Sequence, residues 1–185
     1  MRNIVDPRAK FWRRCYDTRV KPSLDRLDIR LLNLLQASSM ATADQLAMHV
    51  PLSPSAIARR VRRMRNEGVI ARDVALLAPT LVEDRLQAIV NIMLHEHAQQ
   101  RGLAALRERL IRCAEVQICL EVSGAFDLTL ITITRGMQAF NLFADEMLAD
   151  EPVVRRYETS FVKKAIKYTF AVELDSNDAT DSPRR

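Results

Sequence analysis

Apolar side chains recur at helical spacing in the first half of the chain and predict three helices there. From residue 24 to 36, leucines fall on one helical face, and Asp25 is placed to cap the start of that helix. A polar break follows, after which Thr42 can cap a short second helix that Pro51 ends. The third helix begins only a few residues later, so that a tight turn separates it from the second.

The third helix has a well-marked start and end. Ser53 is a favoured N-cap, Pro54 suits the first helical position, and Gly68 follows the last periodic residue as a C-terminal stop. One side of this helix is apolar at positions i, i+4 and i+7, and such a stripe should face a core. The stripe consists of Ile57, Val61 and Met64.

The second half alternates between strand-like and helix-like segments. Strands are predicted where apolar residues alternate, and helices where leucines or phenylalanines recur at i, i+3 or i+4. The predicted strands cover residues 86–94, 116–122, 128–134, 153–162 and 168–174, with helices after the first and the third. The order βαββαβ, with one extra strand, predicts a ferredoxin-like sheet with both helices on one face. The other face is mixed but too apolar for open solvent, so we expect a homodimer to cover it.

Five parts follow from these patterns, and together they make an α+β chain. They are a basic extension at 1–22, a winged helix-turn-helix domain at 23–77, a linker at 78–85, a ferredoxin-like domain at 86–175 and a disordered tail at 176–185. The extension carries aromatic and basic side chains, and two interpretations of it are open: a frayed terminus, or an arm that contacts DNA or a partner.

The predicted third helix is unusually basic, because five arginines occupy seven consecutive positions. At about 100° per residue, Ser55, Arg59 and Arg62 point away from the apolar stripe, and Arg63 lies to one side of it. A charged face is usually only solvated, but solvated faces mix signs, and here Glu67 stands only at the end. Contact with nucleic acid is therefore favoured over the solvated alternative.

A short helix, a tight turn and a second helix with a basic outer face are typical of a helix-turn-helix, whose second helix enters the major groove of double-stranded DNA. Beyond Gly68, loose alternation over residues 69–79 predicts a small strand, or wing. Arg60 is expected to contact the DNA backbone and to fix the helix. The full set of candidate DNA contacts is Ser53, Ser55, Arg59, Arg60, Arg62, Arg63 and Arg72.

Charge divides the chain in the same way as the pattern. Residues 1–80 hold 15 Lys and Arg against 7 Asp and Glu, whereas residues 81–185 hold 13 against 16. A basic half that meets a polyanion, joined to an acidic half with another task, fits this division. The chain has 3 cysteines without disulfide or metal spacing and no apolar run long enough for a membrane span, so a soluble, cytoplasmic protein is expected.

Catalytic and metal chemistry have little support. His95 and His97 share a strand face, but no Cys or further His stands at partner spacing, so surface or interface histidines are favoured. With 4 glycines and no Ser/His/Asp set, the chain shows no phosphate loop or catalytic triad. We expect no metal, no cofactor and no enzymatic activity.

In order and spacing, these residues resemble the Lrp/AsnC family of bacterial and archaeal regulators, also called feast/famine regulators, from Leu24 to about Leu174. The helix-turn-helix half of the match consists of Leu24, Asp25, Asp28, Leu31, Leu32, Leu35, Gln36, Leu46, Ala47, Leu52, Ser53, Arg60, Val61, Met64, Gly68, Val69 and Ile70. In the second half, the family's Gly-x-x-Asp turn corresponds to Gly124, Ala125, Phe126 and Asp127.

The resemblance implies a transcriptional regulator whose sheets pair into dimers and then into larger rings, an octamer being plausible. It also implies that a small effector, often an amino acid, binds near Gly124, Ala125 and Asp127. The alternative is that this turn is only structural, since Gly-x-x-Asp is ordinary turn chemistry. The family's usual linker glycine is missing after Leu81, and Lys163 and Lys164 put charge where the family is usually apolar.

One enzymatic alternative belongs to a similar two-domain architecture, the sirohaem decarboxylases. Such an enzyme would need histidines and polar aromatic side chains around a tetrapyrrole pocket. This chain has 3 His and 5% aromatic residues, and they do not group in that way. The regulator is therefore the favoured interpretation.

Overall fold

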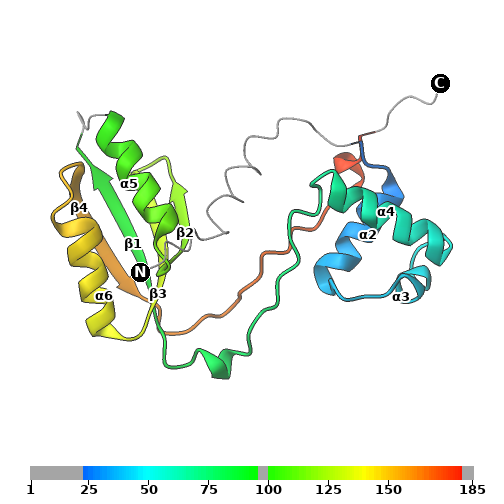
Figure 1. Ribbon diagram of the computed structural model, residues 1–185, viewed down its shortest axis with the longest axis horizontal. Helices are drawn as coiled ribbons and strands as arrows, with labels where there is room; N and C mark the ends of the chain where they lie inside the picture. The colour runs from blue at the N-terminus through cyan, green and yellow to red at the C-terminus, as the bar shows by residue number, and fades with distance from the viewer. Residues whose placement is uncertain (1–22, 96–99, 181–185) are drawn as a thin grey trace, which may run out of the picture. The chain divides into compact units, whose positions relative to one another are not determined.

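The computed structural model describes residues 23–95 and 100–180, which form two compact units (Figure 1). One unit, Leu76–Ile166, contains the sheet; the other combines residues 23–75 with residues 167–180. The predicted extension at 1–22 lies outside the described residues, as do residues 181–185. Among the described helices, none is long and apolar enough to cross a membrane.

The first helix of the smaller unit, α2 (Arg26–Ala37), begins with a reciprocal cap. Asp25 accepts hydrogen bonds from the backbone N–H groups of Leu27 and Asp28, and the Asp28 carboxylate accepts one from the Asp25 N–H. The short α3 (Ala43–Ala47) starts in the same way, with Thr42 as its N-cap. Both predicted starts are confirmed.

Helix α4 (Pro54–Asn66) begins and ends where the sequence predicts. Ser53 Oγ accepts from the Ala56 N–H at 3.3 Å, and Gly68 adopts a φ of 75°, which a side chain would disfavour. The predicted stripe of Ile57, Val61 and Met64 is buried. It packs in a core with apolar side chains of α2, of α3 and of the residues next to them, namely Leu24, Ile29, Leu31, Leu32, Leu35, Leu46 and Val50.

The predicted wing does not form. Residues 71–78 make no strand, and their apolar side chains Val74, Leu76 and Leu77 are exposed. A wing needs a second strand as a partner, and the described residues that follow Gly68 offer none before β1. The segment instead runs extended to a single 3₁₀ turn at Pro79–Leu81.

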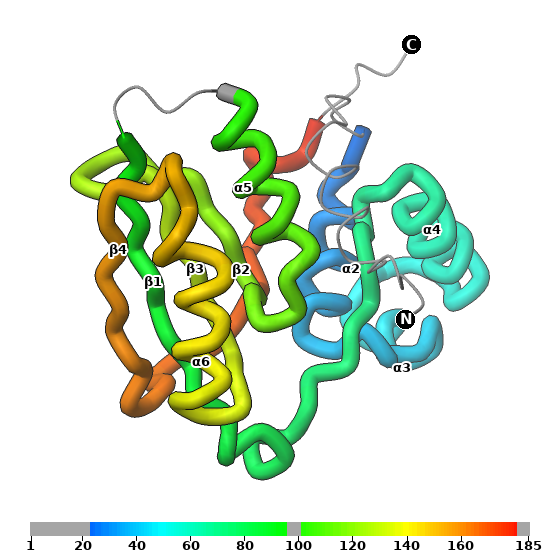
Figure 2. The backbone as a smooth tube through the Cα atoms, turned by 60° about the vertical axis from the view of Figure 1, so that its left-hand side comes forward, coloured from blue at the N-terminus to red at the C-terminus, as the bar shows by residue number. Residues whose placement is uncertain are grey.

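The larger unit is a four-stranded antiparallel sheet with strand order β2-β3-β1-β4. Its strands are β1 (Leu86–Leu94), β2 (Val116–Glu121), β3 (Leu128–Thr134) and β4 (Val154–Phe161). Helices α5 (Gln100–Arg112) and α6 (Met137–Ala144), the latter continued by a π-helical turn at Asp145–Ala149, cover one face (Figure 2). This confirms the predicted βαββαβ order.

Alternation along β1 and β3 places the core between the sheet and its helices. Ala88, Val90 and Ile92 of β1 are fully buried, and Leu106 and Leu110 of α5 meet them in one cluster. The opposite face of the sheet carries half-buried side chains, including Gln87, Ile89, Asn91 and Met93 from β1 and Thr129, Ile131 and Ile133 from β3.

The predicted fifth strand at 168–174 is wrong. These residues are extended but join no strand of the sheet, and they group with the smaller unit. The predicted disorder of the tail is also wrong for residues 176–180, since Asp175 caps a 3₁₀ turn at Ser176–Asp178. In both cases the partner of the segment is helix α2, which periodicity within the segment itself does not reveal.

Candidate nucleic-acid interface

Helix α4 presents two chemically distinct outer surfaces. Ser55, Arg59 and Arg62 are exposed on the side away from the buried stripe. Ser55 also lies 3.1 Å from the Ser53 hydroxyl, so the polar start of the helix is continuous with this face. An exposed serine and two exposed guanidinium groups on one helix face can contact base edges and phosphates.

Arg60 and Arg63 lie on the other side, where they bind carboxylates of α2. Arg60 Nη1 is 2.7 Å from Asp25 Oδ2 and 2.9 Å from Asp28 Oδ1, and Arg63 Nη2 is 2.5 Å from Asp28 Oδ2. Asp28 is 1% exposed, so its charge is almost removed from water. These two arginines therefore neutralise a buried carboxylate and hold α4 against α2. For Arg60 this agrees with the predicted role in fixing the helix, while the DNA contacts of both arginines stay a prediction.

The ion pairs also shift the pKa of Asp25 and of Arg60. Burial alone would raise the pKa of Asp25, but the Asp28 N–H and the Arg60 guanidinium outweigh it and lower that pKa below 3.8. The hydrogen bond to Asp25 raises the pKa of Arg60. Asp25 is therefore ionised at neutral pH. Both carboxylates and the arginines Arg59, Arg60 and Arg63 line a hollow of about 340 Å³.

Two further basic side chains, Arg65 and Arg72, lie at the end of α4 and on the segment after it. Arg65 pairs with Asp73 at 3.2 Å, and Arg72 is exposed on the extended segment that follows the helix. Ser53 serves first as the helix cap. Among the predicted DNA-contacting residues, Ser53, Ser55, Arg59 and Arg62 thus share the exposed surface of α4, while Arg60 and Arg63 do not.

Sequence reasoning missed the role of Asp28. A carboxylate on the apolar face of a leucine-rich helix is a signal that could have revealed it, because a buried charge requires a partner. The partner itself was harder to find, since 32 and 35 residues separate Asp28 from its two arginines.

The Gly-x-x-Asp turn lies between β2 and β3. Gly124 has a φ of 155°, and Ala125 and Asp127 are exposed. Asp127 Oδ2 accepts from the Leu94 N–H at 2.7 Å, and the Asp127 N–H donates to the Ile92 carbonyl at 2.9 Å. The aspartate thus ties the turn to the end of β1, which is a structural role in itself.

His95, at the end of β1, is exposed, whereas His97 lies outside the described residues. Within residues 23–95 and 100–180, no three His, Cys, Asp or Glu side chains come together as a metal site.

A capped three-helix head with outward arginines, joined to an antiparallel α+β unit, defines a helix-turn-helix protein with a second, separate domain. The AsnC-type helix-turn-helix domain matches residues 24–65, and the Lrp/AsnC ligand binding domain matches residues 87–172. The chain belongs to the Lrp/AsnC family, and it is a helix-turn-helix transcriptional regulator of that type.

Relatives and solved structures agree. The chain is 32% identical to the leucine-responsive regulatory protein of Escherichia coli over 153 residues, which cover 82% of this chain and 93% of the relative. It is also 32% identical to an HTH-type transcriptional regulator of Sinorhizobium fredii, over 82% of this chain and 89% of the relative. A Neisseria meningitidis transcriptional regulator solved with L-methionine superposes with a TM-score of 0.74 at 29% identity, over 81% of this chain and 96% of that one.

Proposed function

We propose that this regulator reads double-stranded DNA with the exposed face of α4, through Ser55, Arg59 and Arg62, while Arg60 and Arg63 position the helix. The observation that carries the proposal is the division of the arginines between solvent and the Asp28 carboxylate. Arginine in the major groove binds guanine in a bidentate way, and arginine near a phosphate releases counterions. Arg72 and Ser53 complete the proposed surface as backbone contacts.

The test replaces Arg59 and Arg62 with Ala in the full chain. Binding is measured against a DNA site that the unaltered protein selects from a random pool. We expect affinity to fall about 100-fold, and the slope of log affinity against log salt to decrease by about 1 for each of the two arginines that contacts a phosphate. The thermal unfolding of the protein should not change, since both side chains are exposed.

The matched control is Arg135→Ala/Arg155→Ala, which removes the same charge from exposed positions of the sheet unit. If this control weakens DNA binding as much as Arg59→Ala/Arg62→Ala, only net charge matters and the assignment to α4 fails. A useful third variant is Arg63→Ala. This variant should lower the free energy of unfolding more than it weakens the free energy of DNA binding, because it leaves Asp28 with one partner fewer.

For the effector, we propose an amino acid bound near Gly124, Ala125 and Asp127. Two of the similar structures contain L-methionine, which makes it the first probe. The Asp127 carboxylate could attract an ammonium group while it holds the Leu94 N–H. A thermal-shift screen of the 20 amino acids tests this, since a ligand at 100 times its Kd adds about 2.7 kcal/mol of stability.

Asp127→Asn separates the two interpretations of the turn. The amide oxygen can still accept from the Leu94 N–H, but the charge that would attract an ammonium group is gone. We expect the variant to fold normally and to lose its amino-acid response. A normal response would mean that the carboxylate does not hold the effector and that Asp127 serves the turn alone.

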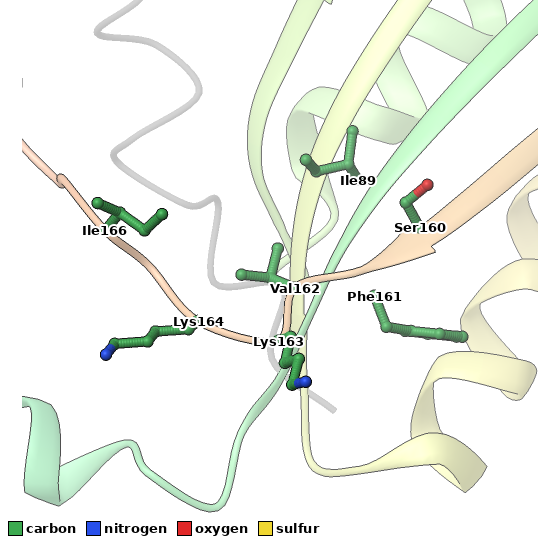
Figure 3. A pocket seen from close by; sticks show the side chains of 7 residues that line it. All are labelled: Ile89, Ser160, Phe161, Val162, Lys163, Lys164 and Ile166. Atoms are coloured by element: carbon green, nitrogen blue, oxygen red, sulfur yellow. The ribbon is translucent and has the colours of Figure 1, made fainter.

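We also propose a homodimer in which a second copy covers the open face of the sheet, with assembly into larger rings such as an octamer. Apolar side chains at its edge, Leu120 and Val122, are exposed, and a hollow of about 570 Å³ at the end of β4 is lined by Ile89, Phe161 and Ile166 (Figure 3). Lys163 and Lys164 also line it. Such a surface favours a protein partner over open solvent.

Leu120→Glu tests the dimer, because the side chain is 46% exposed in a single chain and a charge there should not prevent folding. Sedimentation should show a smaller assembly than for the unaltered protein. The control is Leu142→Glu on α6, which is 65% exposed on the other side of the unit. Equal masses for both variants and the unaltered protein would contradict the proposed interface.

We propose, finally, that the chain is not an enzyme. Added sirohaem should leave its absorbance spectrum unchanged beyond that of the free compound. A shifted spectrum that saturates at one equivalent would instead favour the decarboxylase alternative.

A further inference from the structure

Residues 172–180, here called the strap, pack on helix α2 through a paired set of amide contacts. Gln36 Nε2 donates to the Val172 carbonyl at 2.8 Å, and Gln36 Oε1 accepts from the Val172 N–H at 2.7 Å. Asn33 does the same for Leu174, at 2.8 and 3.0 Å. Each side-chain amide thus satisfies both backbone groups of one residue, as a neighbouring strand does in an antiparallel sheet.

The spacing of these contacts explains why they suit an extended segment. Asn33 and Gln36 are one turn apart on α2, and the residues they bind are alternate residues of an extended chain, whose polar groups point the same way. A helix at residues 172–174 would have used those backbone groups internally. The side-chain amides of Asn33 and Gln36 therefore favour an extended backbone, whatever side chains that backbone carries.

The strap also contributes to the core of the DNA-binding unit. Leu174 and Ala179 pack against its buried cluster, and Thr180 Oγ1 accepts from the Leu24 N–H at 3.0 Å, just before α2. Between them, the Asp175 carboxylate accepts from the Asn177 N–H at 2.6 Å and fixes the turn. The strap therefore holds α2 at its C-terminal half and at its beginning.

Helix α2 is in turn the platform of α4, since its Asp28 binds both Arg60 and Arg63. The helix-turn-helix match ends at residue 65 and the ligand-domain match at residue 172, so nearly all of the strap lies beyond both. We propose that the strap is a working part of this chain's DNA-binding unit: it braces α2 and thereby positions α4 for DNA. This inference rests on the proposed function only for its DNA-binding consequence.

The covalent path gives the strap a second consequence. Strand β4 ends at Phe161 and the strap begins at Val172, so ten residues, which extend to at most about 35 Å, tie the last strand to α2. Within residues 23–95 and 100–180, the chain thus passes between the two units near residues 75–76 and again near residues 166–167. If the end of β4 moves farther from α2 than these ten residues can reach, the strap must leave α2.

Hydrogen exchange of the full-length protein tests the bracing directly and needs no DNA. In the unaltered chain, the Val172 and Leu174 amides should be protected, because Gln36 and Asn33 accept from them. In Asn33→Leu/Gln36→Leu, both amides should exchange at least about tenfold faster. Gln36→Glu keeps the acceptor and loses the donor, so its Val172 amide should lie between the two.

The control is Arg30→Ala, an exposed position on the same helix, which should leave both exchange rates unchanged. A second pair of variants covers the case in which the double variant folds poorly. A chain that ends at Ala171 lacks the strap, whereas a chain that ends at Thr180 keeps it. Only the shorter chain should unfold its DNA-binding unit at a lower temperature.

DNA affinity is the second readout. If the brace keeps α4 in its binding geometry, Asn33→Leu/Gln36→Leu should bind DNA about tenfold more weakly, because the competent conformation is less populated. Unprotected Val172 and Leu174 amides in the unaltered chain would overturn the proposal. So would DNA affinity that is equal in the two truncated chains. A protein that shows the protected amides but binds no DNA would keep the strap and refute the DNA-binding role.

Discussion

The DNA-binding unit and the sheet unit are held together by different kinds of contact. In the first, a carboxylate that is 1% exposed binds two arginines of the helix proposed to read DNA, so charge lies at the contact between α2 and α4. In the second, apolar side chains fill the space between sheet and helices, and the only buried polar side chains among its described residues are Thr132 and Thr134. Its ion pairs, such as Arg107 with Glu121, lie at the surface, except that of Arg109 with Glu151, whose side chain is 10% exposed.

Because of this difference, the stability of the two units should respond differently to pH and salt. Packing of apolar groups depends little on pH or salt, whereas a network of charges depends on both. If the two units are independent and buried charge matters mainly in the DNA-binding unit, a substitution in one unit should leave the stability of the other unchanged.

The largest effects are expected from the two cores. Leu106→Ala in the sheet unit and Ile57→Ala in the DNA-binding unit each remove a side chain that is 0% exposed, and each should cost about 3 kcal/mol. Because the two residues belong to separate clusters, calorimetry should show that each change lowers the transition of its own unit only. A common shift of a single transition would mean that the units fold as one.

Asp28→Ala should be the next largest effect, about 2 kcal/mol in the DNA-binding unit. It removes the carboxylate that Arg60 and Arg63 share, although Arg60 keeps Asp25 and both guanidinium groups can still reach water. The matched change in the sheet unit is Glu121→Ala, whose exposed carboxylate binds the half-exposed Arg107. We expect less than about 1 kcal/mol there. Urea unfolding of both variants measures the contrast, and equal costs would contradict the distinction between the units.

Local features of the sequence predicted much of this fold. Each helix start of the DNA-binding unit depends on a side chain within three residues of it, as with Asp25, Thr42 and Ser53. The strands β1 and β3 depend on alternation within each strand. Such features are visible in a short window of sequence, because the physical cause is itself local.

Contacts between distant residues explain what the sequence did not predict. The outward direction of Arg59 and Arg62 followed from periodicity, but the pairing of Arg63 with Asp28 depends on how two helices pack. The strap shows the same limit, since an alternating apolar segment at 168–174 predicts a strand whether its partner is a sheet or two side-chain amides. The predicted wing does not form because no described strand pairs with residues 69–79. The pattern within that segment cannot show whether such a partner exists.

Low pH should reduce the stability of the DNA-binding unit by a smaller amount. The pKa of Asp25 is lowered in the folded protein, so its contribution to stability is present above the ordinary value of 3.8 and is lost as pH falls through the lowered value. The side chain is about half exposed, which keeps the contribution below about 1 kcal/mol. Unfolding of the DNA-binding unit between pH 5 and 2 should show this loss, and Asp25→Asn should reduce it. An unchanged acid response in that variant would assign the loss to other carboxylates.

The smallest expected effect is on the reactivity, and not the stability, of a group in the sheet unit, the thiol of Cys113. Burial raises the pKa of Cys113 to about 11, with a further contribution from its hydrogen bond to Glu115. Since the thiolate is the nucleophile, alkylation of Cys113 by iodoacetamide should be slow at pH 8 and should still rise about tenfold per pH unit up to pH 10. Glu115→Gln should speed the reaction only in part, because burial is the larger cause, whereas unfolding in urea should remove the whole delay. Mass spectrometry of the labelled peptide measures both rates. If Glu115→Gln alone restored ordinary reactivity, charge rather than burial would govern this thiol, and the sheet unit would resemble the DNA-binding unit after all.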